Sequence, residues 1–405
     1  MTSSRRLFGL CAGAALVATT LPGAAFAATK STAYVAVSDG NSSAYLIDWL
    51  PKSKARLANN NGAQSGVVTD DGTQKVITLN TPISYTFDNW DDCGEEIRQR
   101  SDTQQVVVRD HTGGVTEFVE IGATTNIGGC QDGLSVPFGG LTDAGRNLNR
   151  LAMAARPPVT DLVPGTQIAG FSEDVMLPGE TAVAHDVVTM QSGSMQFHAS
   201  GHTVPAAFNA DQWLVLDLPS GQRAYTRLAL DAKTGGETWL MADWSAGKPQ
   251  RIEELMVVKP TAGAGFGTVA QASRMWNSGL FIESRTPFYF YLYKNGTGER
   301  VQKDLDLGTE SRTPIPSWGF DGLNLVQQRP FGPGTRDRTW APLSNTGKFH
   351  WVMESETAFD GSDTFVLVKP RVNYYLDTGK AVPPANGLKA SRGFVSMHEK
   401  SKIAR

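Results

Sequence analysis

The chain has 405 residues, 40% of them hydrophobic, and its 37 Lys and Arg residues nearly balance 40 Asp and Glu residues. A formal net charge of −3 argues against nucleic acid or an anionic lipid surface as the main partner. The length exceeds that of a usual single hydrophobic core, so one large architecture or two domains are expected.

An export signal is predicted at the start of the chain. Arg5 and Arg6 carry positive charge, residues 7–21 are mainly apolar, and Ala25-Phe26-Ala27 has the small-x-small pattern that a signal peptidase recognises. We therefore expect residues 1–27 to be a signal peptide and the mature protein to be exported, to the periplasm or the extracellular space. Because cleavage removes both arginines, the expected mature net charge is −5.

The segment Ser4-Arg5-Arg6-Leu7-Phe8 also resembles the twin-arginine signal, which exports folded proteins. The alternative is an ordinary secretory signal that contains two arginines. No later stretch has enough consecutive apolar residues to span a membrane as a helix, so no transmembrane segment is expected.

The mature chain would contain two cysteines, Cys93 and Cys130, because Cys11 leaves with the signal. An even pair in an exported protein predicts one structural disulfide. Closing a loop of about 38 residues stabilises a fold by roughly 4 kcal/mol on the loop-entropy account. Neither cysteine has another cysteine close by in the sequence, so a redox or metal role is not expected.

Most of the chain alternates between strand-like runs and turn clusters, which predicts consecutive β-hairpins. Helices are expected only at Glu95–Arg100 and at Asp143–Ala155, the second of which ends before Pro157-Pro158. In chain order, expected hairpins turn at 38–41, 110–114 and 295–296, and the runs 364–368 and 372–375 are interpreted as the strands of another.

Regular turns also predict an antiparallel meander between about 211 and 258. Asp217, Asp231 and Asp243 each precede a Gly by four residues. Because Asp can accept hydrogen bonds from its own following backbone and Gly tolerates a positive φ, each cluster is expected to close a tight turn.

The middle turn lies within Ala229-Leu230-Asp231-Ala232-Lys233-Thr234-Gly235-Gly236-Glu237-Thr238-Trp239, which is similar to the tryptophan-docking repeat of pyrroloquinoline-quinone dehydrogenase propellers. In that family Thr-Gly makes the turn and Trp packs between adjacent blades. The resemblance covers eleven residues and is not repeated with its Trp elsewhere in the chain. It therefore predicts a turn followed by a core Trp239, and the chain is not assigned to that family.

The predicted fold class is all-β, with an antiparallel meander and hairpin architecture. A propeller-like arrangement is narrowly favoured over paired β-sandwich or barrel domains, because hairpins outnumber signs of long crossovers. The expected regions of the mature chain are 28–156, which is β-rich and holds the disulfide; 157–167, a Pro-rich linker; 168–382, the antiparallel meander; and 383–405, a basic tail.

A zinc site is the first metal hypothesis. Three of the six histidines, His185, His198 and His202, lie close together in the sequence. If Ser192-Gly193 closes a hairpin between them, His185 and His198 become diagonal neighbours on one face of the sheet. His202, or a carboxylate from elsewhere, would then complete a zinc site. The alternative is that all three are polar residues on a solvated face.

Calcium is the second metal hypothesis, because carboxylate oxygens suit this ion and an acidic run surrounds the first mature cysteine. The alternative is a solvated surface or the start of a helix, where the helix dipole favours acidic residues. The run consists of Asp88, Asp91, Asp92, Glu95 and Glu96.

Aromatic residues offer a candidate ligand-binding surface. Tyr289, Tyr291 and Tyr293 alternate with apolar residues along one predicted strand, so the apolar set should face the core and leave a tyrosine stripe that can stack on a sugar or contact a partner. Trp318 and Trp340 lie in segments rich in Gly and Pro. Exposed tryptophans there would be functional, whereas buried ones would be structural.

Two functions follow as hypotheses. The first is a non-catalytic exported β scaffold that binds a carbohydrate, peptide or protein partner. The second is a secreted hydrolase, either metal-assisted through His185 and His198 or based on carboxylates. No serine-hydrolase elbow, dinucleotide fingerprint or phosphate-binding loop is present in the sequence. A glycosidase needs only two carboxylates that meet in space, so it stays open.

Overall fold

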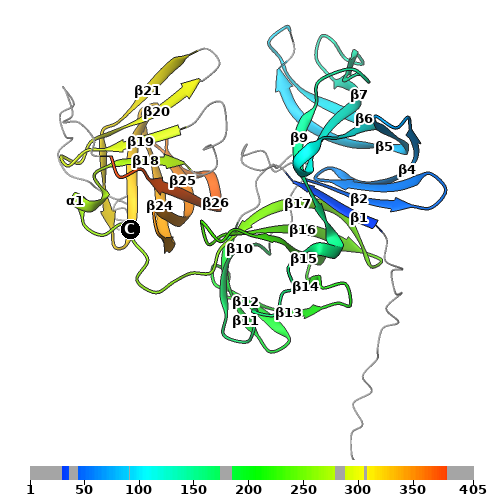
Figure 1. Cartoon of the computed structure of the whole chain (residues 1–405). Coiled ribbons are helices and arrows are strands. Elements are labelled where there is room, and N and C mark those ends of the chain that lie inside the picture. Colours follow the sequence, from blue (N-terminus) through cyan, green and yellow to red (C-terminus); the bar gives the residue numbers. More distant parts are fainter. Residues whose placement is uncertain are drawn as a thin grey trace, which may run out of the picture.

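Three antiparallel sheets of nine, eight and nine strands make up nearly the whole described chain (Figure 1). The predicted all-β antiparallel class is confirmed. The predicted signal peptide and basic tail lie outside the described residues and stay predictions. The structure, a computed structural model, describes residues 30–35, 44–90, 92–173, 185–278, 288–304 and 308–380.

The first sheet closes on itself. Its strand order is β6-β5-β4-β3-β2-β1-β9-β7-β8, and an additional pairing of β6 with β7 joins every strand except β8 into a ring. The cluster inside this ring includes Ile47, Leu57 and Ile77, which are completely buried. Alternate residues of a strand share one face, so each strand presents its apolar set to this cluster. The elements are β1 Lys30–Val35, β2 Ala44–Leu50, β3 Lys54–Asn59, β4 Gly62–Asp70, β5 Lys75–Trp90, β6 Glu96–Asp110, η1 Thr112–Gly114, β7 Val115–Ile127, β8 Ser135–Phe138, β9 Arg146–Ala152 and η2 Met153–Ala155.

Two segments predicted as α-helices are mainly strands. Glu95–Arg100 contains the start of β6, and Asp143–Ala155 contains β9 and the short 3-10 helix η2. Charged runs have reasonable helix propensity, but both strands pair on two sides and bury Ile97 and Leu148. Burial and strand pairing therefore outweigh the weak local preference.

Cys93 and Cys130 form a disulfide, as predicted. The bond joins the turn between β5 and β6 to the segment that follows β7. Across the same junction Gln131 Nε2 donates a hydrogen bond to Asp92 Oδ2 at 2.9 Å. The covalent bond thus ties together two hairpin ends of the first sheet.

We expect reduction of this disulfide to lower the thermal midpoint while the β circular dichroism spectrum is kept. The cross-link removes roughly 4 kcal/mol of unfolded-state entropy, and the second and third sheets contain no cysteine. Thermal unfolding of untreated and reduced protein measures the effect. The Cys93→Ser/Cys130→Ser variant should match the reduced protein, and equal midpoints for all three samples would contradict the expectation.

The second sheet is an antiparallel meander, with strands β10 to β17 neighbouring in chain order, and it contains the turns predicted between about 211 and 258. Ala169 N–H donates to the Val258 carbonyl at 2.8 Å and Val258 N–H donates back at 3.1 Å, so the sheet is nearly closed and barrel-like. Inside it, Trp239 is fully buried, as the turn-and-Trp pattern predicts. The strands are β10 Gln167–Phe171, β11 Asp186–Gln191, β12 Ser194–Phe197, β13 Thr203–Phe208, β14 Leu214–Leu218, β15 Gly221–Leu230, β16 Glu237–Ser245 and β17 Lys248–Val257.

The third sheet has the order β21-β20-β19-β18-β26-β25-β24-β23-β22. The hairpin predicted at 295–296 forms between β19 and β20. The runs 364–368 and 372–375 lie instead in one strand, β26, because the register shifts opposite β25 and absorbs the irregular residues between them. The elements are α1 Val269–Ala272, β18 Met275–Ser278, β19 Phe288–Leu292, β20 Gly298–Asp304, β21 Thr309–Ile315, β22 Ser317–Asp321, β23 Asn324–Phe331, β24 Gly334–Thr346, β25 Phe349–Phe359 and β26 Thr364–Asp377.

The described strands do not form the four-stranded blades of a propeller, which was the narrowly favoured arrangement. Two of the sheets protect their edges by curving until distant strands meet. Helix α1 spans only four residues, and no helix in the described ranges is long and apolar enough to cross a membrane.

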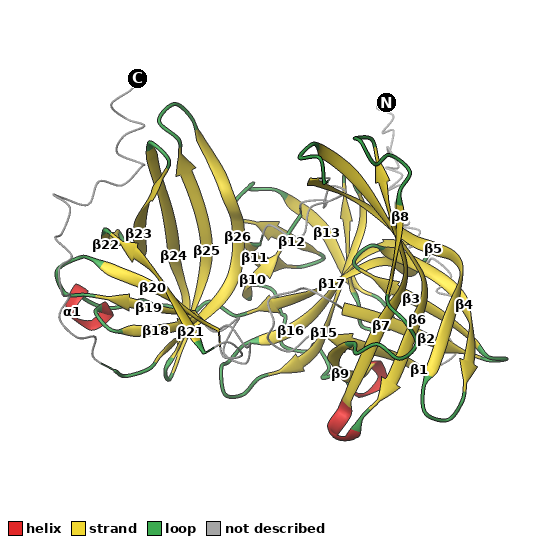
Figure 2. Cartoon of the chain, turned by 90° about the horizontal axis from the view of Figure 1, so that it is seen from above, coloured by secondary structure: helices red, strands yellow, loops and turns green. Residues whose placement is uncertain are grey.

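The second sheet lies between the other two (Figure 2). A cluster that includes Leu46 and Leu240 joins the first sheet to the second, and a cluster that includes Val258 and Trp351 joins the second to the third. The segment 157–167 connects β9 and η2 to β10 and is held against the second sheet, where Arg227 Nη1 lies 2.9 Å from Asp161 Oδ1. Arg227 is itself buried.

Candidate functional site

The hairpin predicted at Ser192-Gly193 is present. Gln191 pairs with Ser194, and Gly193 has the positive φ of 75° that this turn requires. His198 N–H continues the ladder by donating to the Val187 carbonyl at 3.0 Å. The backbone register on which the zinc hypothesis depended is therefore the expected one.

The ring of His185 is used to attach β26 of the third sheet. Its Nδ1 accepts a hydrogen bond from the backbone N–H of Val372 at 2.7 Å, and the backbone N–H of His185 donates to the Pro370 carbonyl at 2.6 Å. Burial, together with the positive charge of Arg371, lowers the pKa of His185 to about 3. The ring is therefore neutral near pH 7 and acts as a structural acceptor.

The other two histidines have separate partners. His198 Nε2 lies 2.7 Å from Thr189 Oγ1, and His202 Nδ1 lies 3.3 Å from Glu173 Oε2. Within the described residues, no three His, Cys, Asp or Glu side chains are placed so that they could hold a metal ion. The structure thus assembles neither the zinc site nor a calcium site in the described part of the acidic run; Asp91 lies outside the described residues.

The tyrosine stripe lies beside cationic side chains. Lys303 Nζ lies 5.4 Å from the ring centre of Tyr289, and Arg312 Cζ lies 5.8 Å from that of Tyr291. Tyr293 is buried. The alternation of faces is as expected, because Phe290 in the same strand belongs to the core, and the rings of Tyr289 and Tyr291 are half-buried.

Trp318 and Trp340 are both core residues. Trp318 Nε1 donates to the carbonyls of Tyr293 and Thr297 at 3.0 and 2.9 Å. The Trp340 ring stacks on Tyr375 with 3.7 Å between ring centres. Both belong to the apolar cluster of the third sheet, so their role is structural, and the binding role expected of exposed rings does not apply.

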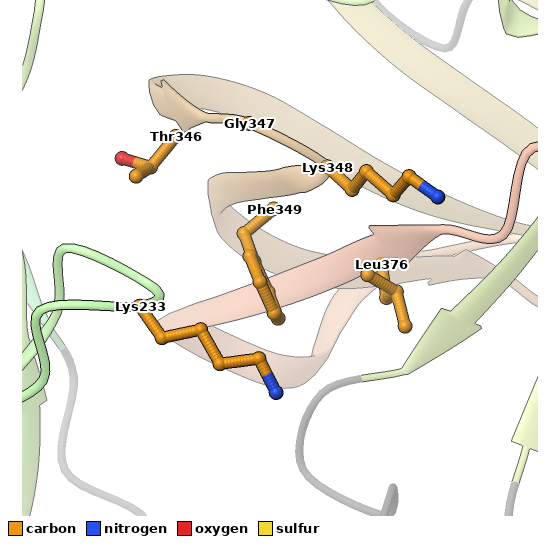
Figure 3. A pocket seen from close by; sticks show the side chains of 6 residues that line it. All are labelled: Lys233, Thr346, Gly347, Lys348, Phe349 and Leu376. Carbon is orange, nitrogen blue, oxygen red and sulfur yellow. The ribbon is translucent and has the colours of Figure 1, made fainter.

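A pocket of about 270 Å³ lies where the second and third sheets meet (Figure 3). One wall comes from the turn between β15 and β16, and the other from the β24–β25 hairpin and from β26. The lining residues are Lys233, Thr346, Gly347, Lys348, Phe349 and Leu376.

The turn between β15 and β16 is held against the third sheet. Asp231 accepts hydrogen bonds from the Lys233 N–H at 2.9 Å and from Thr234 Oγ1 at 2.7 Å. Trp351 Nε1 donates to the Thr234 carbonyl at 2.7 Å, and a Cβ at Gly236 would collide with the Trp351 ring. These contacts place Lys233 at the pocket.

The opposite wall follows from the tight β24–β25 turn, in which Gly347 has a φ of 59°. Lys348 and Phe349 come directly after this glycine. Lys233 Nζ lies 5.7 Å from the Phe349 ring centre, and Figure 3 shows the lysine stem running beside that ring. The pocket therefore combines two exposed ammonium groups with an aromatic wall, and its lining contains no acid or histidine that could act in proton transfer.

The pocket residues were not singled out from the sequence. A signal existed, because Lys233-Thr234-Gly235 and Thr346-Gly347-Lys348 are both turn sequences that include a lysine. No local pattern in the sequence predicts that the two turns lie next to each other.

A second group of charges lies on the inner face of the second sheet. Arg223, Asp243 and Arg251 form one row across β15, β16 and β17. Arg251 Nε lies 3.0 Å from Asp243 Oδ2, and Arg223 Nη2 lies 3.6 Å from Asp243 Oδ1. Beside them Glu253 is only 2% exposed, and burial raises its pKa to about 7 against the opposing effect of the two arginines.

The cationic pocket between two sheets and the buried carboxyl of Glu253, with its raised pKa, are both candidate sites. Comparison with known proteins gives no match to a family model, to a curated protein sequence or to a solved structure.

Proposed function

We propose that the protein is an exported, non-catalytic β scaffold and that the pocket between its second and third sheets binds an acidic peptide or protein partner. The observation that supports this most is the pocket itself, which is lined by Lys233, Lys348 and Phe349. Ammonium groups attract carboxylates, and lysine stems cover apolar parts of a partner. Phe349 is only 9% exposed, which leaves little ring face for a sugar to stack on.

Export is part of the same proposal. It is supported by the signal-like residues 1–27 and by the disulfide between Cys93 and Cys130, since structural disulfides persist in oxidising compartments.

The test is binding of a fluorescently labelled oligoglutamate peptide, followed by anisotropy at low ionic strength. We expect the Lys233→Gln/Lys348→Gln variant to bind about tenfold more weakly, and we expect added salt to weaken binding to the original protein, because exposed charges are screened. The matched control is Lys54→Gln, which removes an exposed lysine of β3 in the first sheet. Equal affinity of all three proteins, or equal binding of an oligolysine peptide, would contradict the proposal.

A carboxylate-based hydrolase is the second candidate, favoured by one observation. The raised pKa of Glu253 suits a general acid, and the carboxylate of Asp243 is held by Arg251 nearby. Hydrolysis of a glycoside substrate that is lost in both Glu253→Gln and Asp243→Asn, while both variants remain folded, would favour this candidate over the scaffold.

A further inference from the structure

The inner face of the third sheet carries a group of charged side chains, which we call the arginine cluster. Its members share a face with the apolar core, because Arg338 precedes Trp340 by two residues and Glu354 follows Val352 by two. The cluster consists of Arg300, Arg329, Arg336, Arg338, Arg371, Glu354 and Glu356.

Glu356 is shared by three of these arginines. Its side chain is completely buried, and its Oε1 lies 2.9 Å from Arg329 Nη2. Arg336 and Arg338 also donate to this carboxylate. The two carboxylate oxygens are therefore fully used by guanidinium groups.

Glu354 is saturated in the same way. Its Oε1 lies 3.2 Å from Arg371 Nη2 and 3.7 Å from Arg338 Nε. Its Oε2 accepts from Asn373 Nδ2 at 2.9 Å and from the Tyr375 hydroxyl. Neither glutamate has an oxygen left to neutralise a further cation.

Positive charge therefore exceeds negative charge in the cluster, with five guanidinium groups against two carboxylates. Burial lowers the pKa of Arg329 to about 10, and repulsion from Arg338, Arg336 and Arg300 acts in the same direction. The pKa of Arg300 is also lowered by burial and by the charge of Arg338. Partly buried cations that repel one another are stabilised when an anion joins them.

Two donor atoms on this face of the sheet, one on β23 and one on β26, are buried without a hydrogen-bond partner among the described residues. Gln327 is 1% exposed, lies opposite Arg338 in the register, and is two residues from Arg329 along β23. Its Nε2 has no hydrogen-bond partner among the described residues, and neither has Arg371 Nε. Buried polar groups are nearly always hydrogen-bonded, so these donors indicate an acceptor that the protein itself does not supply.

Two arginines of the cluster are partly exposed to solvent. The side chains of Arg336 and Arg371 are 31% and 36% exposed, whereas those of Arg329 and Arg338 are 9% and 11% exposed. A small ion could thus contact the outer guanidinium groups first and the inner ones next.

We propose that the arginine cluster is an oxyanion-binding site that takes a phosphate or sulfate group, a function independent of the peptide pocket. A tetrahedral group with two charges offers several acceptor oxygens for the guanidinium forks and for the Gln327 amide. A single carboxylate would supply one negative charge and would leave more of the excess positive charge of the arginines uncompensated.

Isothermal titration of the mature protein with inorganic phosphate, inorganic sulfate and acetate at constant ionic strength tests this. We expect binding of phosphate or sulfate and at least tenfold weaker binding of acetate. Methyl phosphate is the fourth probe: tighter binding than inorganic phosphate assigns the site to a group carried on a larger ligand, and weaker binding assigns it to the free ion. Absence of phosphate and sulfate binding at 10 mM, or equal binding of acetate, overturns the proposal.

Three variants separate an anion site from a purely structural cluster. Arg336→Gln and Gln327→Leu should each weaken phosphate and sulfate binding at least tenfold, whereas Arg312→Gln on β21 should leave binding unchanged. Gln327→Leu removes an unpartnered buried donor, so its thermal midpoint should stay equal or rise. If Gln327→Leu and Arg336→Gln remain folded and bind the anion like the original protein, the proposal is wrong.

Discussion

Replacing Glu354 by Gln is expected to destabilise the third sheet by about 3–5 kcal/mol at pH 7, which is typical of removing one partner from a buried ion pair. Glu354 is 1% exposed, and its carboxylate holds Arg338 and Arg371 while accepting from Tyr375. A neutral amide would leave both guanidinium groups without their counter-charge at a buried position.

The stabilisation that Glu354 contributes should depend on pH, and the direction follows from its pKa. Burial alone would raise the pKa of Glu354, but Arg338 and Arg371, helped by hydrogen bonds from Tyr375 and Asn373, lower it to about 2 from an ordinary value of 4.5. A carboxyl with a lowered folded-state pKa stabilises the fold fully above pH 4.5, and this contribution is lost as the pH falls toward 2. The stability difference between the original protein and Glu354→Gln should therefore shrink on acidification.

Urea unfolding of both proteins at pH 7 and pH 3 measures this difference. Glu310→Gln is the matched control, since Glu310 on the exposed strand β21 pairs with Arg312 of the same strand and with Lys303 of β20, and such pairs contribute less than about 1 kcal/mol. A Glu354→Gln variant as stable as the control at pH 7 would show that the buried pair is not needed.

Replacing Glu253 by Gln is expected to have the opposite effect, a stabilisation of about 3 kcal/mol at pH 8. Burial raises the pKa of this carboxyl from 4.5 to about 7, and the charge of Asp243 adds to the rise although Arg251 and Arg223 oppose it. Because the folded-state pKa is raised, the native state is favoured below pH 4.5, and stability is lost as the pH rises from 4.5 to 7. A shift of this size corresponds to about 3 kcal/mol.

Unfolding midpoints of the original protein and of Glu253→Gln between pH 4 and pH 8 test the sign. We expect similar midpoints at pH 4, where the glutamate is protonated in both states, and a higher midpoint for the variant at pH 8. Glu310→Gln again serves as the control and should follow the original protein throughout. A variant that is less stable than the original at pH 8 would mean that the ionised carboxylate stabilises the fold.

Turn chemistry explains which parts of the fold were predictable. The hairpin at Ser192-Gly193 and the turns after Asp217, Asp231 and Asp243 form as expected, since Gly and Asp act on their own backbone within a few residues. The disulfide was also predictable, because Cys93 and Cys130 are the only cysteines after residue 27.

Side-chain exposure was not predictable in the same way. Trp318 and Trp340 lie in turn-rich sequence, yet both are buried because the third sheet wraps around them. His185 and His198 occupy the expected hairpin, but the ring of His185 accepts from Val372 of another sheet, which the hairpin register does not place there, and the ring of His198 bonds to its diagonal neighbour Thr189.

The arginine cluster was predictable only in part. Arg336 and Arg338, like Glu354 and Glu356, are two residues apart, so the sequence determines that each pair shares one face of its strand. Whether that face is inside or outside depends on how the sheet curves, which brings Glu356 onto Arg329, Arg336 and Arg338 from other strands.

The sequence by itself determined the all-β antiparallel class, the positions of most hairpin turns and the disulfide, because alternation of side chains and turn chemistry act over a few residues. Only the tertiary structure decided how the sheets close, which rings are buried and which turns meet. Thr234 and Trp351, whose hydrogen bond builds the pocket wall, are 117 residues apart. Contacts over such separations depend on the packing of whole sheets, and no local pattern in the sequence encodes them.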